Sequence, residues 1–131
     1  MLIRLCKLMT RNRRELAVME SMESGKPIRD CEDIDIPEAI HTIKWHAEAV
    51  DKIYDQTGPS GDGAISMIVR EPIGVVFQIT PWNAPVFTAG WQIAPAIAAG
   101  NGVVIKPSEL TPMTTVALAM IAEGAGLPKG L

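Results

Sequence analysis

Four side chains that could bind or activate a ligand stand just after two apolar segments of this sequence. Trp82 and Asn83 follow the first segment, and Lys106 and Glu109 follow the second. An acid beyond the end of such a strand can accept hydrogen bonds from ribose hydroxyls, and the nearby ammonium can donate to the same sugar. Asn83 carries an amide NH₂ that could stabilise a developing oxyanion, and Trp82 offers a flat apolar wall.

Each of these side chains also has a simpler interpretation. Glu109 and Lys106 can form an exposed surface pair, which contributes only about 0–1 kcal/mol. Asn83 can cap a helix that begins at Pro85, and Trp82 can serve packing alone. The sequence has no G-x-G-x-x-G phosphate-binding motif, so these residues by themselves leave both interpretations open.

The elements that must position these residues form a strand–helix–strand unit. Residues 73–79 and 103–105 are apolar segments of strand length, and the helix predicted over 86–99 lies between them. Such a unit is nearly always parallel, so the turns at 80–83 and 106–109 open on one edge of the sheet, where ligands bind. The near-continuous apolar strand favours a sheet covered on both faces, and Pro95 predicts a kink or an early break in the helix.

The rest of the chain reads as helices around this unit. A helix is predicted over 2–24, ending at Gly25, and a strand over 66–70 after a loop at 57–63. The second predicted helix starts with Asp35 as its cap and Pro37 in its first turn. The apolar stripe of this second helix consists of Ile36, Ile40, Ile43, Ala47, Val50 and Tyr54. The last helix is predicted to start with Thr111 as its cap and Pro112 as its first residue.

Composition excludes several classes of protein. The 131 residues are 47% hydrophobic with a net charge of −3, which is typical of a globular domain and argues against nucleic-acid binding. The sequence lacks a run of about 20 apolar residues and a signal peptide, so we expect a cytoplasmic protein without a membrane partner. Cys6 and Cys31 predict plain thiols, and His41 and His46 are five apart, which does not fit a helical metal pair. We therefore expect no metal site.

Several spaced motifs resemble the aldehyde dehydrogenase superfamily. They are E-P-I-G-V-V at 71–76, P-W-N-A-P at 81–85, I-A-P-A-I-A-A-G-N at 93–101 and V-I-K-P-S-E at 104–109. Upstream, E-S-G-K-P at 23–27 resembles the family's E-x-G-K-P, and A-G-L-P at 125–128 continues the likeness downstream. Sequence segments such as A-E-A-V-D-K-I-Y at 47–54 most resemble the branch that acts on amino- and glutamyl-aminobutyraldehydes.

The resemblance implies an α/β fold, with N-terminal helices and the first part of a Rossmann-like parallel βαβ nucleotide-binding sheet. It implies helices and a loop in 1–63, a strand segment in 64–72 and the start of the NAD-binding unit in 73–131. It also implies an NAD(P)-dependent oxidation of an aldehyde through a cysteine thiohemiacetal and thioester. Asn83 aligns with the oxyanion-hole asparagine. The residues implied to contact the cofactor are Ile79, Thr80, Pro81, Trp82, Lys106, Ser108 and Glu109.

Glu109 favours NAD, because a carboxylate repels the 2′-phosphate of NADP, but Lys106 leaves NADP possible. Two residues differ from the family's sequence pattern. Gln92 stands where a lysine is common, so the charge-relay role of that lysine is not assigned to Gln92. Ala84 stands where a bulky residue is common.

The likeness also implies that the nucleophilic cysteine and the glutamate base lie beyond residue 131, and that full-length relatives form homo-oligomers. We expect an inactive N-terminal fragment with a large exposed apolar surface, and the alternative is a nucleotide-binding or interaction module.

Overall fold

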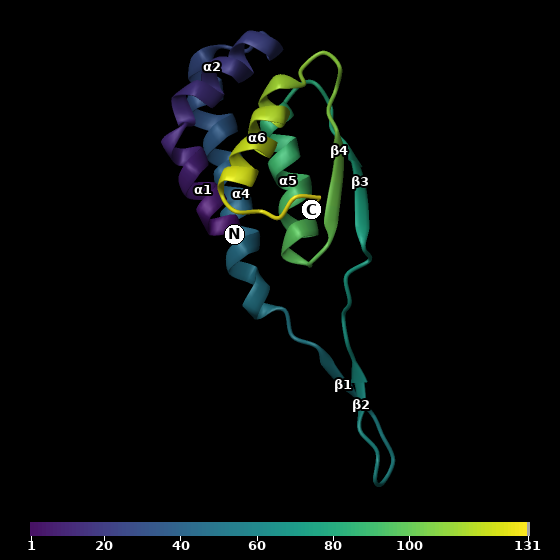
Figure 1. The fold of residues 1–131 in the computed structure, drawn as a ribbon. Coiled ribbons are helices and arrows are strands. Elements are labelled where there is room, and N and C mark those ends of the chain that lie inside the picture. The colour runs from purple at the N-terminus through teal and green to yellow at the C-terminus, as the bar shows by residue number, and fades with distance from the viewer. Residues whose placement is uncertain (131) are drawn as a thin grey trace.

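The computed structural model describes residues 1–130. Helices form a layer on one side of a two-stranded sheet, and a hairpin arm extends away from this body (Figure 1). The fold class predicted from the sequence, N-terminal helices joined to the start of a parallel βαβ unit, is confirmed.

The N-terminal segment forms two helices where a single one was predicted. Helix α1 spans Leu2–Arg11 and α2 spans Arg13–Ser24. They are separated at Asn12, whose side chain donates to the carbonyl of Leu8 at 2.8 Å and so competes with the continuing helix. Helix α2 ends at Gly25 as expected, with the left-handed φ of 73° that glycine adopts without strain.

The second helical segment starts earlier than predicted. Helix α3 (Ile28–Asp30), a π-helical turn η1 (Cys31–Asp35) and α4 (Ile36–Ala49) follow one another, and the 3₁₀ turn η2 (Val50–Lys52) ends the run. Asp35 is therefore not a cap, since its backbone is helical. The π-helical turn comes just before Pro37, whose ring nitrogen has no N–H to donate to the helix.

The predicted apolar stripe is buried only where its residues lie within α4. Ile36 and Ile43 are fully buried, whereas Val50 is half exposed and Tyr54, beyond the helix, is 77% exposed. The chain leaves the helical layer at this point to form the arm. The last two positions of the predicted stripe are thus wrong.

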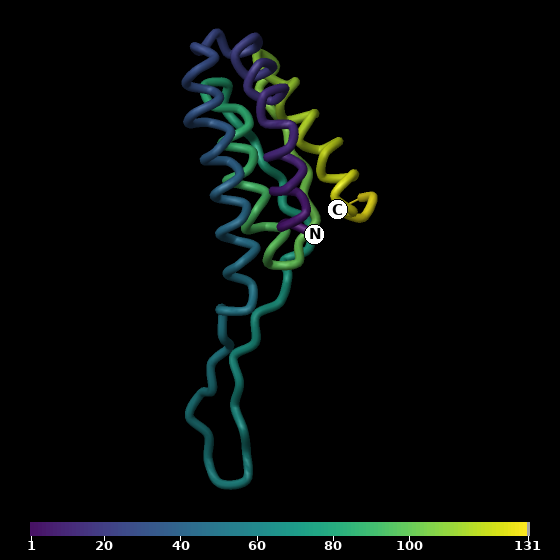
Figure 2. The backbone as a smooth tube through the Cα atoms, turned by 90° about the vertical axis from the view of Figure 1, so that its left-hand side faces the viewer, coloured from purple at the N-terminus to yellow at the C-terminus, as the bar shows by residue number. Residues whose placement is uncertain are grey.

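The arm is a hairpin of β1 (Gln56–Gly58) and β2 (Ser66–Ile68), paired antiparallel. The predicted loop over 57–63 is wrong at its first two residues, which belong to β1, and the predicted strand over 66–70 is shorter. Both views show the arm projecting away from the helices (Figures 1 and 2). Every residue of β2 is exposed, so cross-strand hydrogen bonds and not a core hold this element.

The predicted strand–helix–strand unit is present. Strands β3 (Val75–Ile79) and β4 (Gly102–Lys106) pair in parallel, with Ile79 opposite Lys106, and α5 (Pro85–Ala98) connects them. Asn101 fixes the return into β4, because its side chain accepts from Gly74 N–H at 3.0 Å and donates to the carbonyl of Ala96 at 3.1 Å. Pro95 does not end α5, which continues to Ala98.

The helices cover only one face of this sheet. On the opposite face Phe77 and Ile79 are each 63% exposed and Val104 is 53% exposed, so the expectation of cover on both faces is not met within residues 1–130. The expected exposed apolar surface is present there. Helix α5 is buried against α4 but leaves Trp91 exposed.

The last helix, α6, spans Met113–Gly124 and packs on α1, α2 and α5. The core lies inside the helical layer, and its largest fully buried apolar side chains are Leu5, Met9, Ile36, Ile43, Val86 and Leu118. Among the described residues, no helix is long and apolar enough to cross a membrane.

Candidate functional site

The two turns predicted to share a ligand lie side by side. Thr80 N–H donates to the carbonyl of Lys106 at 3.1 Å, which extends the parallel pairing by one residue beyond β3. Thr111 Oγ1 then donates to the carbonyl of Trp82 at 3.2 Å. Segments 80–83 and 106–111 are therefore tied together at the carboxyl edge of the sheet, where open α/β sheets bind their ligands.

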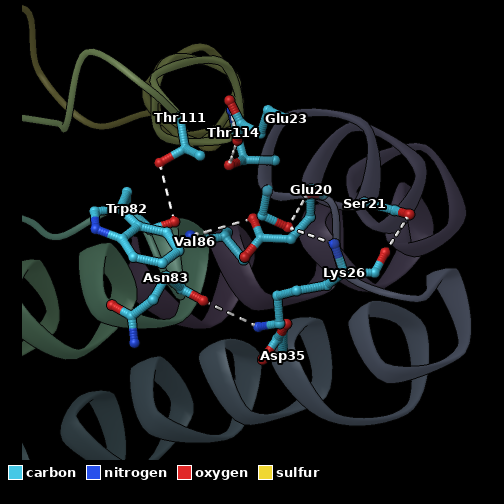
Figure 3. Close-up of polar contacts among 11 residues, drawn as sticks. Glu20, Ser21, Glu23, Lys26, Asp35, Trp82, Asn83, Val86, Thr111 and Thr114 are labelled. Carbon is cyan, nitrogen blue, oxygen red and sulfur yellow. Dashed lines mark hydrogen bonds and ion pairs between the residues drawn. The ribbon is translucent and has the colours of Figure 1, made fainter.

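Asn83 presents its side chain at this edge. The residue is exposed, and within residues 1–130 no hydrogen bond engages its amide. The capping interpretation is not met, because Ala84 is the cap residue of α5 and no side-chain cap bond is formed. The Asn83 carbonyl instead accepts a hydrogen bond from Lys26 Nζ at 3.3 Å, and Figure 3 shows the amide on the other side of the residue.

Lys106 and Glu109 form the surface pair that the simpler interpretation required. Lys106 Nζ lies 2.9 Å from Glu109 Oε2, and the two side chains are 50% and 81% exposed. The hydrogen bond to its own backbone N–H, followed by the contact with Lys106, lowers the pKa of Glu109 below its ordinary value. Glu109 is thus ionised at neutral pH, with oxygen atoms open to a sugar hydroxyl.

The other predicted cofactor residues differ in exposure. Ile79, Pro81 and Trp82 are exposed, whereas Thr80 is 2% exposed and its hydroxyl has no partner within residues 1–130. Ser108 Oγ accepts from the N–H of Leu110 at 3.3 Å, which shapes the second turn. A buried hydroxyl without a partner is uncommon and stands beside the edge where a polar ligand would bind.

None of the main hollows within residues 1–130 is lined by all of these residues. A depression beside β3 and α5 contains Ile79 and is lined by Phe77, Gln78, Thr88, Trp91, Gln92 and Pro95. A second, mostly apolar pocket lies between α5, β4 and α6 and contains none of the predicted residues; Ile93, Ile97, Val103, Leu118 and Leu127 belong to its lining. The candidate site is therefore an open edge of the sheet, not an enclosed cavity.

A cluster of polar side chains, which was not predicted from the sequence, connects α2 to the turn at 80–83 and to the starts of α5 and α6 (Figure 3). Helix α2 contributes Glu20, whose Oε2 accepts from the N–H of Val86 in the first turn of α5 at 3.3 Å. One helical turn later, Glu23 accepts from the N–H groups of Met113 at 2.6 Å and Thr114 at 3.0 Å. Two carboxylates of α2 thereby cap the N-termini of α5 and α6, which attract negative charge.

The cap predicted for α6 is therefore corrected. Thr111 turns its hydroxyl toward the Trp82 carbonyl, and the α6 cap residue is Pro112, which makes no side-chain cap bond. Glu23 supplies the cap from a distant helix, which is possible because α2 packs against α6. A cap from a distant helix leaves no signal at the local sequence where capping residues are sought.

Burial sets the charge behaviour of this cluster. Glu20 is fully buried, and loss of water raises its pKa to about 7, against the opposing effect of the Val86 N–H. Lys26 forms an ion pair with Asp35, and their side chains are only 28% and 11% exposed. The burial of Glu20 could have been predicted from the sequence. Leu16, Ala17 and Glu20 lie on one face of α2, so the spacing places this glutamate in line with buried apolar residues.

Comparisons with known proteins identify the family. The aldehyde dehydrogenase family model matches residues 1–131. The chain belongs to the aldehyde dehydrogenase family. It is 52% identical over 130 residues to an aminoacetaldehyde dehydrogenase of Pseudomonas aeruginosa, covering 99% of this chain and 26% of that protein. It is 45% identical to the NADP/NAD-dependent aldehyde dehydrogenase PuuC of Escherichia coli, covering 98% of this chain and 26% of PuuC.

A solved structure agrees with this assignment. The crystal structure of gamma-glutamyl-gamma-aminobutyraldehyde dehydrogenase from Burkholderia cenocepacia superimposes with a TM-score of 0.96 at 42% identity, over 98% of this chain and 26% of that one. The resemblance to the aminoaldehyde branch noted in the sequence is thus supported. The chain spans about a quarter of the length of these relatives.

Gln92, Cys6 and Cys31, which the sequence also singled out, lie among the packed elements of the fold. Gln92 donates to the carbonyl of Ile79 at 3.5 Å, and its own carbonyl accepts from Gln78 at 2.7 Å, so it serves as a neutral link between α5 and β3. Cys6 and Cys31 are free and buried, and burial raises the pKa of both thiols, that of Cys31 to about 11. The interpretation as plain thiols stays a prediction, and within residues 1–130 no group of three or more potential metal ligands occurs.

Proposed function

We propose that this chain is the N-terminal part of an NAD(P)-dependent aldehyde dehydrogenase that converts an aldehyde to a carboxylic acid. In this proposal the chain supplies the oxyanion donor, Asn83, and the residues that hold the adenosine end of the cofactor. The observation that carries the proposal is the Asn83 amide, exposed and without a hydrogen bond within residues 1–130, at the edge that also bears Lys106 and Glu109.

The arrangement fits a ribose. A vicinal diol needs one acceptor and one donor, and Glu109 and Lys106 provide them within 2.9 Å of each other. The buried Thr80 hydroxyl adds an unpartnered polar group at the same edge. The negative charge of Glu109 supports NAD over NADP, because a carboxylate repels a 2′-phosphate, while Lys106 leaves room for both.

Asn83 would act on the carbonyl oxygen of the aldehyde. When a thiolate attacks the carbonyl carbon, the new C–S bond forms as the π electrons move to oxygen, and the Asn83 N–H stabilises this oxyanion. Since the charge exists only after attack, the amide favours the transition state over the substrate. When bound, NAD(P)⁺ would supply the acceptor for the hydride that leaves the substrate carbon, and hydrolysis of the resulting thioester would release the carboxylic acid.

The nucleophile and the base are proposed to come from outside these 131 residues. Cys6 and Cys31 do not suit the role, because both are buried in the helical layer and their raised pKa values keep them protonated at neutral pH. We accordingly expect no NADH formation from an aldehyde by the isolated chain. Three expectations stay predictions: the division of the chain into segments 1–63, 64–72 and 73–131, the cytoplasmic location, and the assembly of full-length relatives into homo-oligomers.

A chimera tests the function directly. Residues 1–131 replace the matching quarter of the Pseudomonas aeruginosa relative, and NADH formation from aminoacetaldehyde is followed at 340 nm. We expect an active chimera in which Asn83→Ala lowers kcat by roughly 10²–10³-fold, as expected for one lost oxyanion donor. Asn12→Ala is the control, because that amide lies at the break between α1 and α2. An active chimera insensitive to Asn83→Ala would refute the assigned role.

Titration of the isolated chain with NAD separates the fragment from a binding module. Trp82 fluorescence reports on the turn, with Trp82→Phe as the control for the signal of the other two tryptophans. Saturable quenching that is lost in Glu109→Ala supports the alternative, a nucleotide-binding module. A flat titration supports a chain that needs the rest of the enzyme to bind its cofactor.

A further inference from the structure

The backbone around Asn83 is held at three points by groups from other parts of the chain. The carbonyl of Trp82 accepts from Thr111, the carbonyl of Asn83 accepts from Lys26, and the N–H of Val86 donates to Glu20. Thr111 lies just before α6, Lys26 lies just after α2, and Glu20 is on the buried face of α2. A turn whose backbone is fixed in this way by other segments holds the Cα of Asn83, and so the origin of its exposed side chain, in a defined place.

Lys26 differs from the other two anchors because it is a cation and is itself held by an ion pair. Its ammonium pairs with Asp35, whose side chain is 11% exposed, and the lysine side chain is 28% exposed. Coulomb attraction is stronger in such a partly buried site than at the surface. Gly25, with its left-handed φ of 73°, turns the chain from α2 toward this position.

The geometry relates Lys26 to the direction of the Asn83 amide. A carbonyl held by a charged donor fixes its peptide plane, and that plane limits the direction in which the side chain leaves the backbone. Figure 3 shows the carbonyl of Asn83 toward Lys26 and the amide turned to the opposite side. An oxyanion donor is effective only when it is oriented before the charge develops.

We infer that Lys26, anchored by Asp35, is a positioning residue that orients the Asn83 amide for the oxyanion. The consequence for catalysis rests on the proposed function, whereas the orientation itself is a property of this chain. Lys26 lies in the E-S-G-K-P segment, 57 residues before Asn83 in the sequence, and contacts the backbone carbonyl of Asn83, not its amide.

Selective ¹⁵N labelling of asparagine tests the orientation in the chain itself. The sequence contains only Asn12, Asn83 and Asn101, so the spectrum holds three backbone signals and three side-chain pairs. The side chains of Asn12 and Asn101 are hydrogen-bonded to carbonyls in other surroundings and serve as internal references. Lys26→Met keeps the aliphatic stem and removes the charge, and Lys26→Arg restores a cationic donor.

In Lys26→Met we expect the Asn83 signals to shift and to broaden or double, while those of the two reference asparagines stay in place. Lys26→Arg should return a single set of Asn83 signals. Lys44→Met, which removes an exposed lysine 3.7 Å from Glu48, should change none of them. An unshifted, single Asn83 set in folded Lys26→Met overturns the inference, and so does an equal change at all three asparagines.

If Lys26→Met does not fold, Lys26→Gln, whose side chain is one bond shorter, is measured instead with the same two outcomes. The spectra are recorded without cofactor or aldehyde, so they do not depend on the proposed reaction. In the chimera, Lys26→Met should lower kcat with little change in the KM for aldehyde. A shifted Asn83 signal together with an inactive chimera would count against the proposed function alone.

Discussion

Replacing Glu20 with glutamine should change how the stability of this chain depends on pH. Glu20 is fully buried on α2 and accepts a hydrogen bond from the N–H of Val86, while its second oxygen has no partner within residues 1–130. Burial raises its pKa from the ordinary 4.5 to about 7. Glutamine has nearly the same shape, can accept the same hydrogen bond and carries no charge at any pH.

The sign and the size follow from the two pKa values. Below pH 4.5 the carboxyl is protonated in the folded and the unfolded chain. Between pH 4.5 and about 7 the unfolded chain releases the proton first, so the free energy of unfolding falls as pH rises. Each tenfold difference in proton affinity is worth about 1.4 kcal/mol, so the complete loss is about 3 kcal/mol. This loss is complete above pH 7, where both states are ionised.

Urea unfolding followed by circular dichroism at several pH values from 4 to 8 measures the effect. The free energy of unfolding of Glu20→Gln minus that of the wild type should increase by about 3 kcal/mol between pH 4 and 8. Glu15→Gln, at an exposed position of the same helix, should produce no such trend. If the Glu20→Gln and wild-type curves ran parallel from pH 4 to 8, the assigned burial and charge of Glu20 would be wrong.

Two further substitutions test the packing that positions the site. Glu23→Ala removes the carboxylate that accepts from Met113 and Thr114 N–H, and should lower the free energy of unfolding by about 1–2 kcal/mol, as measured in urea. Gly90→Val should cost about 1–3 kcal/mol, because a Cβ there already meets the Cβ of Ala39 at 3.4 Å; Gly90→Ala is the matched control and should cost less than Gly90→Val.

The parallel unit could be predicted from the sequence because its signals are local. An apolar segment, an apolar helix and a second apolar segment define the topology, and a parallel connection places both turns on one edge. Ile79 opposite Lys106 follows from that topology together with the short return at Gly100 to Gly102. The arrangement of the turns thus required no knowledge of side-chain contacts.

The hairpin arm and the start of the second helical segment could not be predicted in this way. The arm is held by cross-strand pairing of exposed residues, and no alternating burial distinguishes it from a loop. Asp35 has the residue type and position of a helix cap, but its partner is Lys26, which lies in a different segment. A capping pattern describes neighbours along the chain, and a contact across the fold can override it.

The family's motifs nevertheless identified the segment that supports the site before its physical role was known. The resemblance at 23–27 stood far from the turns and had no chemistry assigned to it. In the fold, Glu23 caps α6, Gly25 ends α2, and Lys26 reaches the Asn83 carbonyl.

The contacts of Glu23 and Lys26 join α2 and the residues just after it to elements that border the sheet edge, and Glu20 adds a link to α5. Because caps of this kind contribute only about 1–2 kcal/mol each, their value for stability alone is modest. Their shared effect is geometric: α2 sets where the turn at 80–83 and the start of α6 lie relative to each other. We therefore expect substitutions of Glu23 and Lys26 to shift this turn as well as to change the stability of the chain.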